Sequence, residues 1–291
     1  MKNPLFTGVC TALVTPFLNG EVNYPMLERL IARQLEGGVH AIVLCGTTGE
    51  APTLTDEEKR DIIARAKQVT GDDCLIIAGT GSNDTSHAVR LSRQAQEAGA
   101  DAVLVVSPYY NKATPEGLCL HYQAVALSVQ LPVIVYNVPS RTGVDIPVSV
   151  YRELSAMPNI AGVKEATGDM KKILSIHAQC PAHFRVWSGC DELTVPTLAL
   201  GGAGVISVLS NLYPEMTQTM VSAGLDGDFD TAADLQIRFE PIIPALFSQP
   251  NPIPVKAAMK LLGFDCGEPR LPLTPASHQL AEKLGTLLNI V

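Results

Sequence analysis

Short apolar runs rich in valine and isoleucine recur along the chain, and longer segments with a helical spacing of apolar residues lie between them. Runs that are apolar throughout are typical of strands covered on both faces, as in parallel sheets. The pattern predicts eight strands, at Val9–Val14, Ala41–Cys45, Leu75–Ala78, Ala102–Val106, Val133–Tyr136, Ile160–Lys164, Arg185–Ser188 and Gly204–Val208.

The intervening segments carry signals for helix ends. Thr55–Glu58 reads as a capping box, in which a threonine and a glutamate satisfy each other's backbone N–H groups. Pro115 after Thr114 fits the first turn of a helix, and Asn83–Ser86 supplies cap residues for a helix that runs through Ala98. Glycines stand where helices are expected to stop, at Gly37, Gly38 and Gly99.

Strands that alternate with helices predict an α/β fold, and their number favours a closed (β/α)8 TIM barrel. An open doubly wound sheet has the same rhythm, so periodicity alone leaves it open. After Val208 only helical segments follow, and we expect a barrel over residues 1–224 and a C-terminal helical extension over residues 225–291. The helices predicted there are Phe229–Pro241, Pro254–Leu262 and Thr274–Asn289.

Composition narrows the range of partners. Of the 291 residues, 46% are hydrophobic and 17% are charged, as in ordinary globular proteins. The net charge of −8 argues against nucleic acid or an anionic membrane surface as a partner. No apolar run approaches the ~18 residues that cross a bilayer, and Met1–Gly8 carries no apolar signal core. The seven scattered cysteines lack zinc-site spacing and read as free thiols, so we expect a cytoplasmic protein without a metal.

In a (β/α)8 barrel the active site lies at the carboxyl ends of the strands, so residues that end the predicted strands are the first candidates. Lys164 ends the sixth strand, and strand alternation places it on one face with Gly162 and Ile160. A lysine that points into the barrel could act as a nucleophile, whereas one at the wet end of the strand would only be solvated. The residues alone leave both interpretations open.

Other strand ends carry groups that could bind anions or move protons. Gly46–Glu50 places Thr47 and Thr48 between glycines, where backbone N–H groups and hydroxyls can converge on a carboxylate. Tyr136 ends the fifth strand with a hydroxyl, and Arg141 follows in a loop suited to clamping a carboxylate. Each of these features has a purely structural alternative. The threonine loop could be only a tight turn, Tyr136 a core residue and Arg141 a surface residue.

Two further loops have less specific chemistry. Tyr109 and Tyr110 follow the fourth strand, where aromatic residues more often indicate packing or an interface than catalysis. Gly201–Gly204 precedes the eighth strand. This run could be an anion loop, as in phosphoester- or flavin-binding barrels, or close packing, which we prefer.

Taken together, these segments resemble the 4-hydroxy-tetrahydrodipicolinate synthase (dihydrodipicolinate synthase) family, from Gly8–Phe17 to the helical end of the chain. Four motifs carry the resemblance: Gly46–Glu50, Asn137–Gly143, Val163–Ala166 and Asn251–Lys256. The wider pyruvate-dependent class I aldolase superfamily shares Gly46–Glu50. Asn137–Gly143 distinguishes this family from the rest of the superfamily, because it contains Arg141.

The resemblance implies a lyase that condenses pyruvate with L-aspartate 4-semialdehyde in the diaminopimelate route to lysine, with no metal or organic cofactor. By position, Lys164 matches the family's Schiff-base lysine. Thr48, Tyr136 and Tyr110 match a hydroxyl relay for proton transfer, in which the residue at Tyr110 reaches into the site of a neighbouring subunit.

The same resemblance implies the substrate-binding residues. Thr47 and Thr48 match the pyruvate carboxylate site, and Arg141 matches the site of the semialdehyde carboxylate. Gly189 and Ile206 match residues that line the family's active site. The family also implies a homotetramer built as a dimer of dimers.

The nearest alternatives are other aldolases of the superfamily, N-acetylneuraminate lyase or a 2-keto-3-deoxy-sugar-acid aldolase. They would share Lys164 and Tyr136 but should lack the Pro-Ser-Arg-Thr-Gly run around Arg141. A non-catalytic binding barrel is a third alternative, but it would have no need for a hydroxyl relay.

Lysine-inhibited members of this family carry a feedback site at a subunit interface. Asn83 and Tyr109 fit that pattern, but Lys59 and His87 stand where the resemblance implies histidine and glutamate. A cation at Lys59 would repel the ammonium group of lysine, and His87 offers no carboxylate to attract it. The region comprises Ala51, Pro52, Asp56, Lys59, Asn83, His87 and Tyr109.

We therefore expect weak or absent inhibition by lysine. Initial rates measured against increasing lysine concentration would check this. Half-inhibition at a submillimolar concentration would contradict it.

Overall fold

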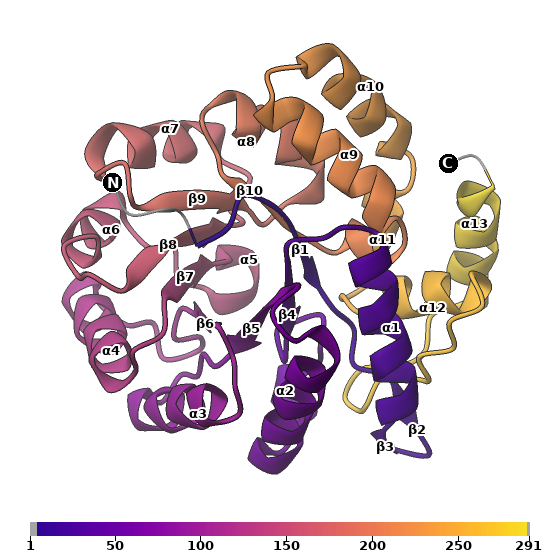
Figure 1. Ribbon diagram of the computed structural model, residues 1–291, viewed down its shortest axis with the longest axis horizontal. Helices are drawn as coiled ribbons and strands as arrows, with labels where there is room; N and C mark the ends of the chain where they lie inside the picture. The colour runs from indigo at the N-terminus through magenta and orange to yellow at the C-terminus, as the bar shows by residue number, and fades with distance from the viewer. Residues whose placement is uncertain (1–4, 290–291) are drawn as a thin grey trace.

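The computed structural model describes residues 5–289, so the start of Met1–Gly8 and the end of the C-terminal region lie outside the described residues. Within them, eight parallel strands form a closed barrel in the order β1-β10-β9-β8-β7-β6-β5-β4, with helices around its outside (Figure 1). The strands are β1 (Gly8–Ala12), β4 (Ala41–Leu44), β5 (Leu75–Gly79), β6 (Ala102–Val106), β7 (Val133–Asn137), β8 (Ile160–Glu165), β9 (Arg185–Ser188) and β10 (Gly204–Ser207).

The predicted (β/α)8 barrel is confirmed, because β1 pairs with both β4 and β10 and leaves no open edge. Each predicted strand agrees with an observed strand to within two residues at either end. A helix follows each strand and packs on the outside. These helices are α1 (Tyr24–Glu36), α2 (Asp56–Thr70), α3 (Thr85–Glu97), α4 (Pro115–Ser128), α6 (Val148–Leu154), α7 (Met170–Gln179), α8 (Thr194–Ala199) and α9 (Pro214–Leu225).

The predicted helix starts are observed. Thr55 and Glu58 form a reciprocal capping box at the start of α2. Thr114 caps α4, with Pro115 in its first turn. Within Asn83–Ser86, the residue that caps α3 is Asp84, whose side chain accepts from the backbone of the first turn.

Strand alternation divides the core into two parts. Side chains such as Val43, Ile134 and Trp187 fill the barrel interior. Their neighbours along each strand, such as Ile42 and Val135, pack beneath the surrounding helices. Each fully buried side chain of this size contributes roughly 1.5–3 kcal/mol, so both faces of every strand help to hold the barrel closed.

The β8 strand contains an irregularity that the apolar pattern did not predict. Val133 of β7 is paired with Ile160, but the next residue, Ile134, is paired with Gly162. Ala161 is therefore an additional residue in β8, as in a β-bulge.

Ile160 packs in the outer part of the core. Our prediction that Ile160 shares a face with Gly162 and Lys164 is therefore wrong, because the bulge interrupts the alternation between them. Beyond the bulge, Lys164 is paired with Tyr136 and Trp187, and both of these side chains lie in the barrel interior.

The C-terminal region comprises four helices that pack on the barrel. The segment after the third of them returns to α1, where Arg29 and Arg33 each lie 4.8 Å from the centroid of the Phe264 ring. The three predicted helices are confirmed with shifted ends, whereas the short α11 was not predicted; a domain boundary at residue 224 stays a prediction. The helices are α10 (Phe229–Phe239), α11 (Ile243–Leu246), α12 (Ile253–Leu261) and α13 (His278–Leu288) (Figure 1).

A small hairpin, formed by β2 (Phe17–Leu18) and β3 (Glu21–Val22), was also not predicted, because its strands are too short to show a period. The Phe17 backbone N–H donates to the Cys266 carbonyl at 2.9 Å. Gly267 passes so close that a Cβ there would lie 2.1 Å from the Phe17 carbonyl oxygen. The C-terminal region thus packs against the hairpin that follows β1.

The Gly201–Gly204 run lies before β10, at the amino ends of the strands, and so on the side away from the candidate site. A Cβ on Gly202 would lie 2.8 Å from the Thr197 carbonyl oxygen. A Cβ on Gly204 would lie 1.9 Å from the Gly8 carbonyl oxygen. Close packing therefore accounts for these glycines. Among the described residues, no helix combines the length and apolar character needed to span a membrane.

Candidate active site

Lys164 lies near the carboxyl end of β8 with its side chain inside the barrel. Only 5% of the residue is exposed, and its Nζ lies 4.5 Å from the centroid of the Tyr136 ring. Within residues 5–289, no carboxylate forms an ion pair with Lys164. A buried ammonium group without a carboxylate is unfavourable for stability, and such an arrangement is typical of a functional site.

Gly189 explains how a long side chain fits at this position. A Cβ on Gly189 would lie 3.2 Å from Lys164 Cε and 2.7 Å from the Ala166 Cβ, so a larger residue would displace the lysine. The Gly189 N–H donates to the Glu165 carbonyl at 2.7 Å, which fixes the strand end. Ile206 is buried in the interior of the barrel on β10. Both residues therefore lie in the same part of the barrel as Lys164.

The loop after β4 carries Thr47 and Thr48. Cys45 and Glu50 flank it with φ angles of 54° and 57°, in the left-handed region that is unfavourable for residues other than glycine. Thr48 is buried, and its Oγ1 accepts a hydrogen bond from Asn251 Nδ2 at 2.9 Å. The Thr47 carbonyl accepts from the Glu50 N–H at 3.1 Å. The loop is a tight turn that holds one threonine hydroxyl inside the protein.

The C-terminal region stabilises this turn through Glu50. Lys256 Nζ lies 2.6 Å from Glu50 Oε1, and both side chains are almost fully buried. The Arg270 backbone N–H donates to Glu50 Oε2 at 2.9 Å, while the Arg270 side chain forms an ion pair with Glu58. Burial lowers the pKa of Lys256, and the Glu50 carboxylate opposes that shift.

Sequence reasoning did not assign a role to Asn251, Lys256 or Arg270. The only signal was the Asn251–Lys256 motif, which was part of the family resemblance. Nothing in the local sequence indicates that its partners are Thr48 and Glu50.

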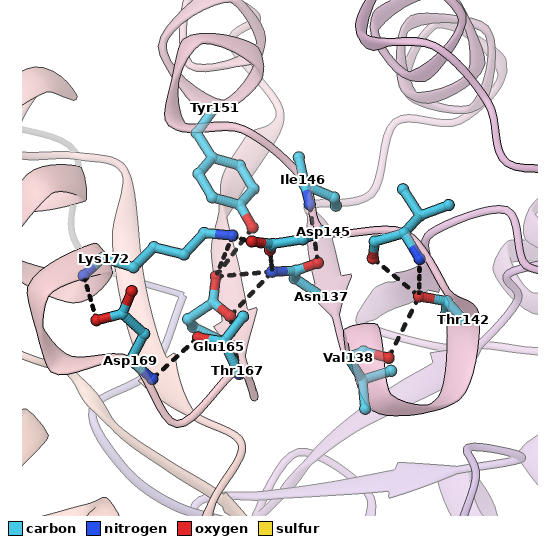
Figure 2. Close-up of polar contacts among 11 residues, drawn as sticks. Asn137, Val138, Thr142, Asp145, Ile146, Tyr151, Glu165, Thr167, Asp169 and Lys172 are labelled. Atoms are coloured by element: carbon cyan, nitrogen blue, oxygen red, sulfur yellow. Dashed lines mark hydrogen bonds and ion pairs between the residues drawn. The ribbon is translucent and has the colours of Figure 1, made fainter.

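Arg141 lies in the short helix α5 (Pro139–Thr142), and its side chain is exposed. Asn137, at the end of β7, fixes the loop that carries it. The Asn137 Nδ2 donates to Asp145 at 2.8 Å, and its Oδ1 accepts from the Ile146 N–H at 3.1 Å (Figure 2). The Thr142 hydroxyl donates to the Val144 carbonyl at 2.9 Å within the same loop. Arg141 is therefore an exposed cation on an ordered loop.

Glu165 lies at the centre of this network (Figure 2). It is buried, and its carboxylate accepts from Asn137 Nδ2 at 3.0 Å and from the Tyr151 hydroxyl at 2.9 Å. Lys172 forms ion pairs with both Glu165 and Asp145. Burial raises the pKa of Glu165, and Lys172 and the hydrogen bonds oppose the shift. The carboxylate next to Lys164 in sequence is thus already occupied by other partners.

Tyr110 does not join the buried group within this chain. The residue is 89% exposed with a φ of 73°, whereas Thr48 and Tyr136 are both buried. Tyr109, which precedes it, is also exposed. The structure therefore brings Lys164 and Tyr136 into contact, but it leaves Tyr110 at the surface of this chain.

The candidate regulatory region forms a paired cluster. His87 Nε2 lies 3.1 Å from both oxygens of Asp56, and Lys59 Nζ lies 3.6 Å from one of them. Asn83 accepts a hydrogen bond at its carbonyl from Asn111 at 2.9 Å. Asp56, the carboxylate of this cluster, is therefore already paired with the chain's own cationic and histidine side chains. Ala51 begins the 3₁₀ turn Ala51–Thr53 that leads to this cluster.

A closed (β/α)8 barrel with a buried, unpaired lysine at the strand ends defines the class of Schiff-base lyases of the class I aldolase type. Within this class, the chain belongs to the dihydrodipicolinate synthetase family, whose model matches residues 5–291. The family expected from the sequence is confirmed.

Similar proteins support the same assignment. The 4-hydroxy-tetrahydrodipicolinate synthase of Acetivibrio thermocellus is 46% identical over 290 residues, which cover 99% of this chain and 98% of that protein. The enzyme of the same name from Lachnoclostridium phytofermentans is 48% identical over 272 residues, or 93% of this chain and 92% of that protein. The crystal structure of dihydrodipicolinate synthase from Aquifex aeolicus aligns with a TM-score of 0.96 at 44% identity, covering 98% of this chain and 97% of that one.

We expect Lys256→Met to lower the free energy of unfolding by about 3–5 kcal/mol, because it leaves the buried Glu50 carboxylate without a partner. Adding Glu50→Gln should restore much of that loss, since no buried charge then remains. Chemical denaturation of the variants would measure both changes.

Lys260→Met is the matched control, because Lys260 lies on the same helix but forms its ion pair with Asp265 at the surface. It should change the free energy of unfolding by less than about 1 kcal/mol. Equal destabilisation by the changes at Lys256 and Lys260 would contradict the assigned contribution of the buried pair.

Proposed function

We propose that this chain condenses pyruvate with L-aspartate 4-semialdehyde to give 4-hydroxy-tetrahydrodipicolinate, the reaction of the diaminopimelate route to lysine. The observation that carries the proposal is Lys164, buried without a carboxylate against the Tyr136 ring in a chain of this family. Full-length relatives named 4-hydroxy-tetrahydrodipicolinate synthase support the substrate pair.

The first half of the reaction requires a nucleophilic amine. Lys164 Nζ loses one proton of its ammonium form and attacks the carbonyl carbon of pyruvate, and the carbonyl oxygen leaves as water to give an iminium. Thr47 and Thr48 hold the pyruvate carboxylate. The iminium withdraws electrons, so a methyl C–H bond breaks and its electron pair forms an enamine. The proton enters the hydroxyl relay of Tyr136 and Thr48, in which each oxygen passes on its own proton as it receives one.

The second half forms the carbon–carbon bond. The enamine carbon attacks the aldehyde of the semialdehyde, whose carboxylate is bound by the planar guanidinium of Arg141. The aldehyde oxygen takes up a proton from the hydroxyl relay and becomes the hydroxyl of the product. The amino group of the new adduct then attacks the iminium carbon, which closes the ring and releases Lys164. Gly189 and Ile206 line the space in which these steps take place.

The exposed Tyr110 supports a role across a subunit interface, as the resemblance implies. We propose a homotetramer, built as a dimer of dimers, in which Tyr110 completes the hydroxyl relay of a neighbouring subunit. The seven free cysteines support a reducing compartment, and we propose the cytoplasm.

A related pyruvate aldolase of sugar acids is not favoured. N-acetylneuraminate lyase and 2-keto-3-deoxy-sugar-acid aldolases would share Lys164, but the relatives reported above carry the synthase name. Direct comparison of turnover with aspartate semialdehyde and with N-acetylneuraminate would distinguish these activities.

The direct test of the proposed function is reduction with borohydride in the presence of pyruvate. We expect a stable adduct on Lys164, because reduction converts the iminium to a secondary amine that peptide mass spectrometry can locate. Lys164→Arg should form none, although it retains a cation. An adduct at another lysine, or no adduct in the unmodified protein, would contradict the proposal.

Arg141→Ala should lower kcat/KM for the semialdehyde by about ten- to a hundredfold, the effect of losing a charge-assisted hydrogen bond. Borohydride trapping of pyruvate should change little, because Arg141 binds the second substrate. Arg90→Ala is the control, since Arg90 is an exposed arginine on α3 outside the site. Equal loss of trapping and of semialdehyde turnover would argue against this role.

A further inference from the structure

A buried hydrogen bond joins Thr48, in the threonine loop, to the C-terminal region. Asn251 lies just before α12, and its Nδ2 donates to Thr48 Oγ1 at 2.9 Å across 203 residues of sequence. Only 6% of Asn251 and 2% of Thr48 is exposed. Bulk water therefore has little access to this contact, and the remaining partners of Thr48 must come from the protein or from a bound substrate.

This hydrogen bond restricts what the Thr48 hydroxyl can do. A threonine hydroxyl has one proton to donate and two lone pairs, whereas the amide NH2 of asparagine only donates. Because Thr48 Oγ1 accepts from Asn251, its own proton must point elsewhere. Over residues 5–289, no protein group accepts that proton. It is therefore available to a substrate.

The side-chain amide of Asn251 has fewer hydrogen-bond partners than is usual for a buried amide. Its Oδ1 is buried and has no hydrogen-bond donor in the described part of the chain. A buried carbonyl oxygen without a donor reduces stability, and most buried side-chain amides are more fully paired. The half-buried Asn159, for comparison, donates at 2.8–3.4 Å to the backbone carbonyls of Ala126, Val129 and Leu131.

The position of Asn251 is fixed by its surroundings. Lys256, in the following turn of α12, forms the buried ion pair with Glu50 at 2.6 Å. The same segment of chain is thus attached to the threonine loop at Thr48 and again at Glu50. These two attachments hold the amide of Asn251 against Thr48.

We propose that Asn251 is a positioning residue that directs the Thr48 hydroxyl proton toward the substrate on Lys164. The inference rests on the proposed function, since it assigns a direction to the hydroxyl relay. With Asn251 donating to it, Thr48 acts as a hydrogen-bond donor on the substrate side of the relay, and loss of this donor slows removal of the methyl proton of pyruvate.

The test separates Schiff-base formation from proton transfer. Borohydride trapping measures the first, and exchange of the pyruvate methyl protons for deuterium, followed by NMR in D2O, measures the second. Asn251→Ala should slow exchange by about five- to tenfold, the effect of one neutral hydrogen bond, while trapping stays near the level of the unmodified protein.

Asn251→Asp keeps the size of the side chain but replaces the donor with an acceptor. Its carboxylate would take the Thr48 proton, so exchange should fall at least as far as in Asn251→Ala. This variant also tests the proposal if Asn251→Ala does not fold. Exchange at the unmodified rate in either folded variant would overturn the inference.

A double-variant comparison tests whether Asn251 acts through Thr48. In a Thr48→Val background, adding Asn251→Asp should slow exchange no further, because the hydroxyl is already absent. If the two losses multiply, Asn251 acts on the loop as a whole, and the inference is wrong.

Asn159→Ala is the control for the loss of a half-buried, hydrogen-bonded amide outside the site. It should lower Tm without slowing exchange relative to trapping, because the Asn159 Nδ2 donates to backbone carbonyls away from the site. Failure of the unmodified protein to trap pyruvate would overturn the proposed function itself. Normal trapping and exchange in both Asn251 variants would overturn only the role of Asn251.

Discussion

The arrangement depends on keeping an ammonium group inside the carboxyl end of the barrel without a carboxylate beside it. The β8 strand carries both charges in succession, with Lys164 directed inward and Glu165 held by Asn137, Tyr151 and Lys172. Consecutive residues of a strand face opposite sides, so the strand itself separates the two charges. The Tyr136 ring then supplies the inner face with a partner that stabilises a cation without neutralising it.

The same network links the end of β8, which carries Lys164, to the loop region that carries Arg141. Asn137 contacts Glu165 on one side and the loop after α5 on the other. A change at Glu165 would therefore affect both the end of β8 and the loop that presents Arg141. The charge separation and the position of the guanidinium are parts of one hydrogen-bonded unit.

The C-terminal region is structurally part of the site, although its helices lie outside the ring. Asn251 contacts Thr48, Lys256 contacts Glu50, and Arg270 contacts both Glu50 and Glu58. The left-handed conformation at Glu50 is unfavourable by itself, and these partners account for its persistence. A (β/α)8 barrel can thus use an appended segment to fix a loop that its own strands leave strained.

Local patterns in the sequence were sufficient for the barrel. The apolar runs located the strands, and Thr55 and Thr114 marked helix starts, because both signals depend on residues close together in the chain. The bulge at Ala161 was not predictable, since an added residue in a short strand leaves no periodic trace.

Recognition of the candidate site depended on family motifs more than on physical reasoning. Lys164 alone was compatible with a solvated strand end, and only the structure shows its burial. The contact of Asn251 with Thr48 joins positions 203 residues apart, and no local rule connects them. The exposure of Tyr110 similarly depends on tertiary structure and not on its neighbours in sequence.

The 203 residues between Thr48 and Asn251 have a consequence for biosynthesis. At a synthesis rate of about 5–20 residues per second, roughly 10–40 s pass between the addition of Thr48 and that of Asn251 to the nascent chain. All eight strands have by then left the peptidyl-transferase centre, yet the loop after β4 still lacks the residues that hold it. The nascent barrel is without these contacts, and a ribosome that stops before Asn251 releases a chain whose loop after β4 lacks all of them.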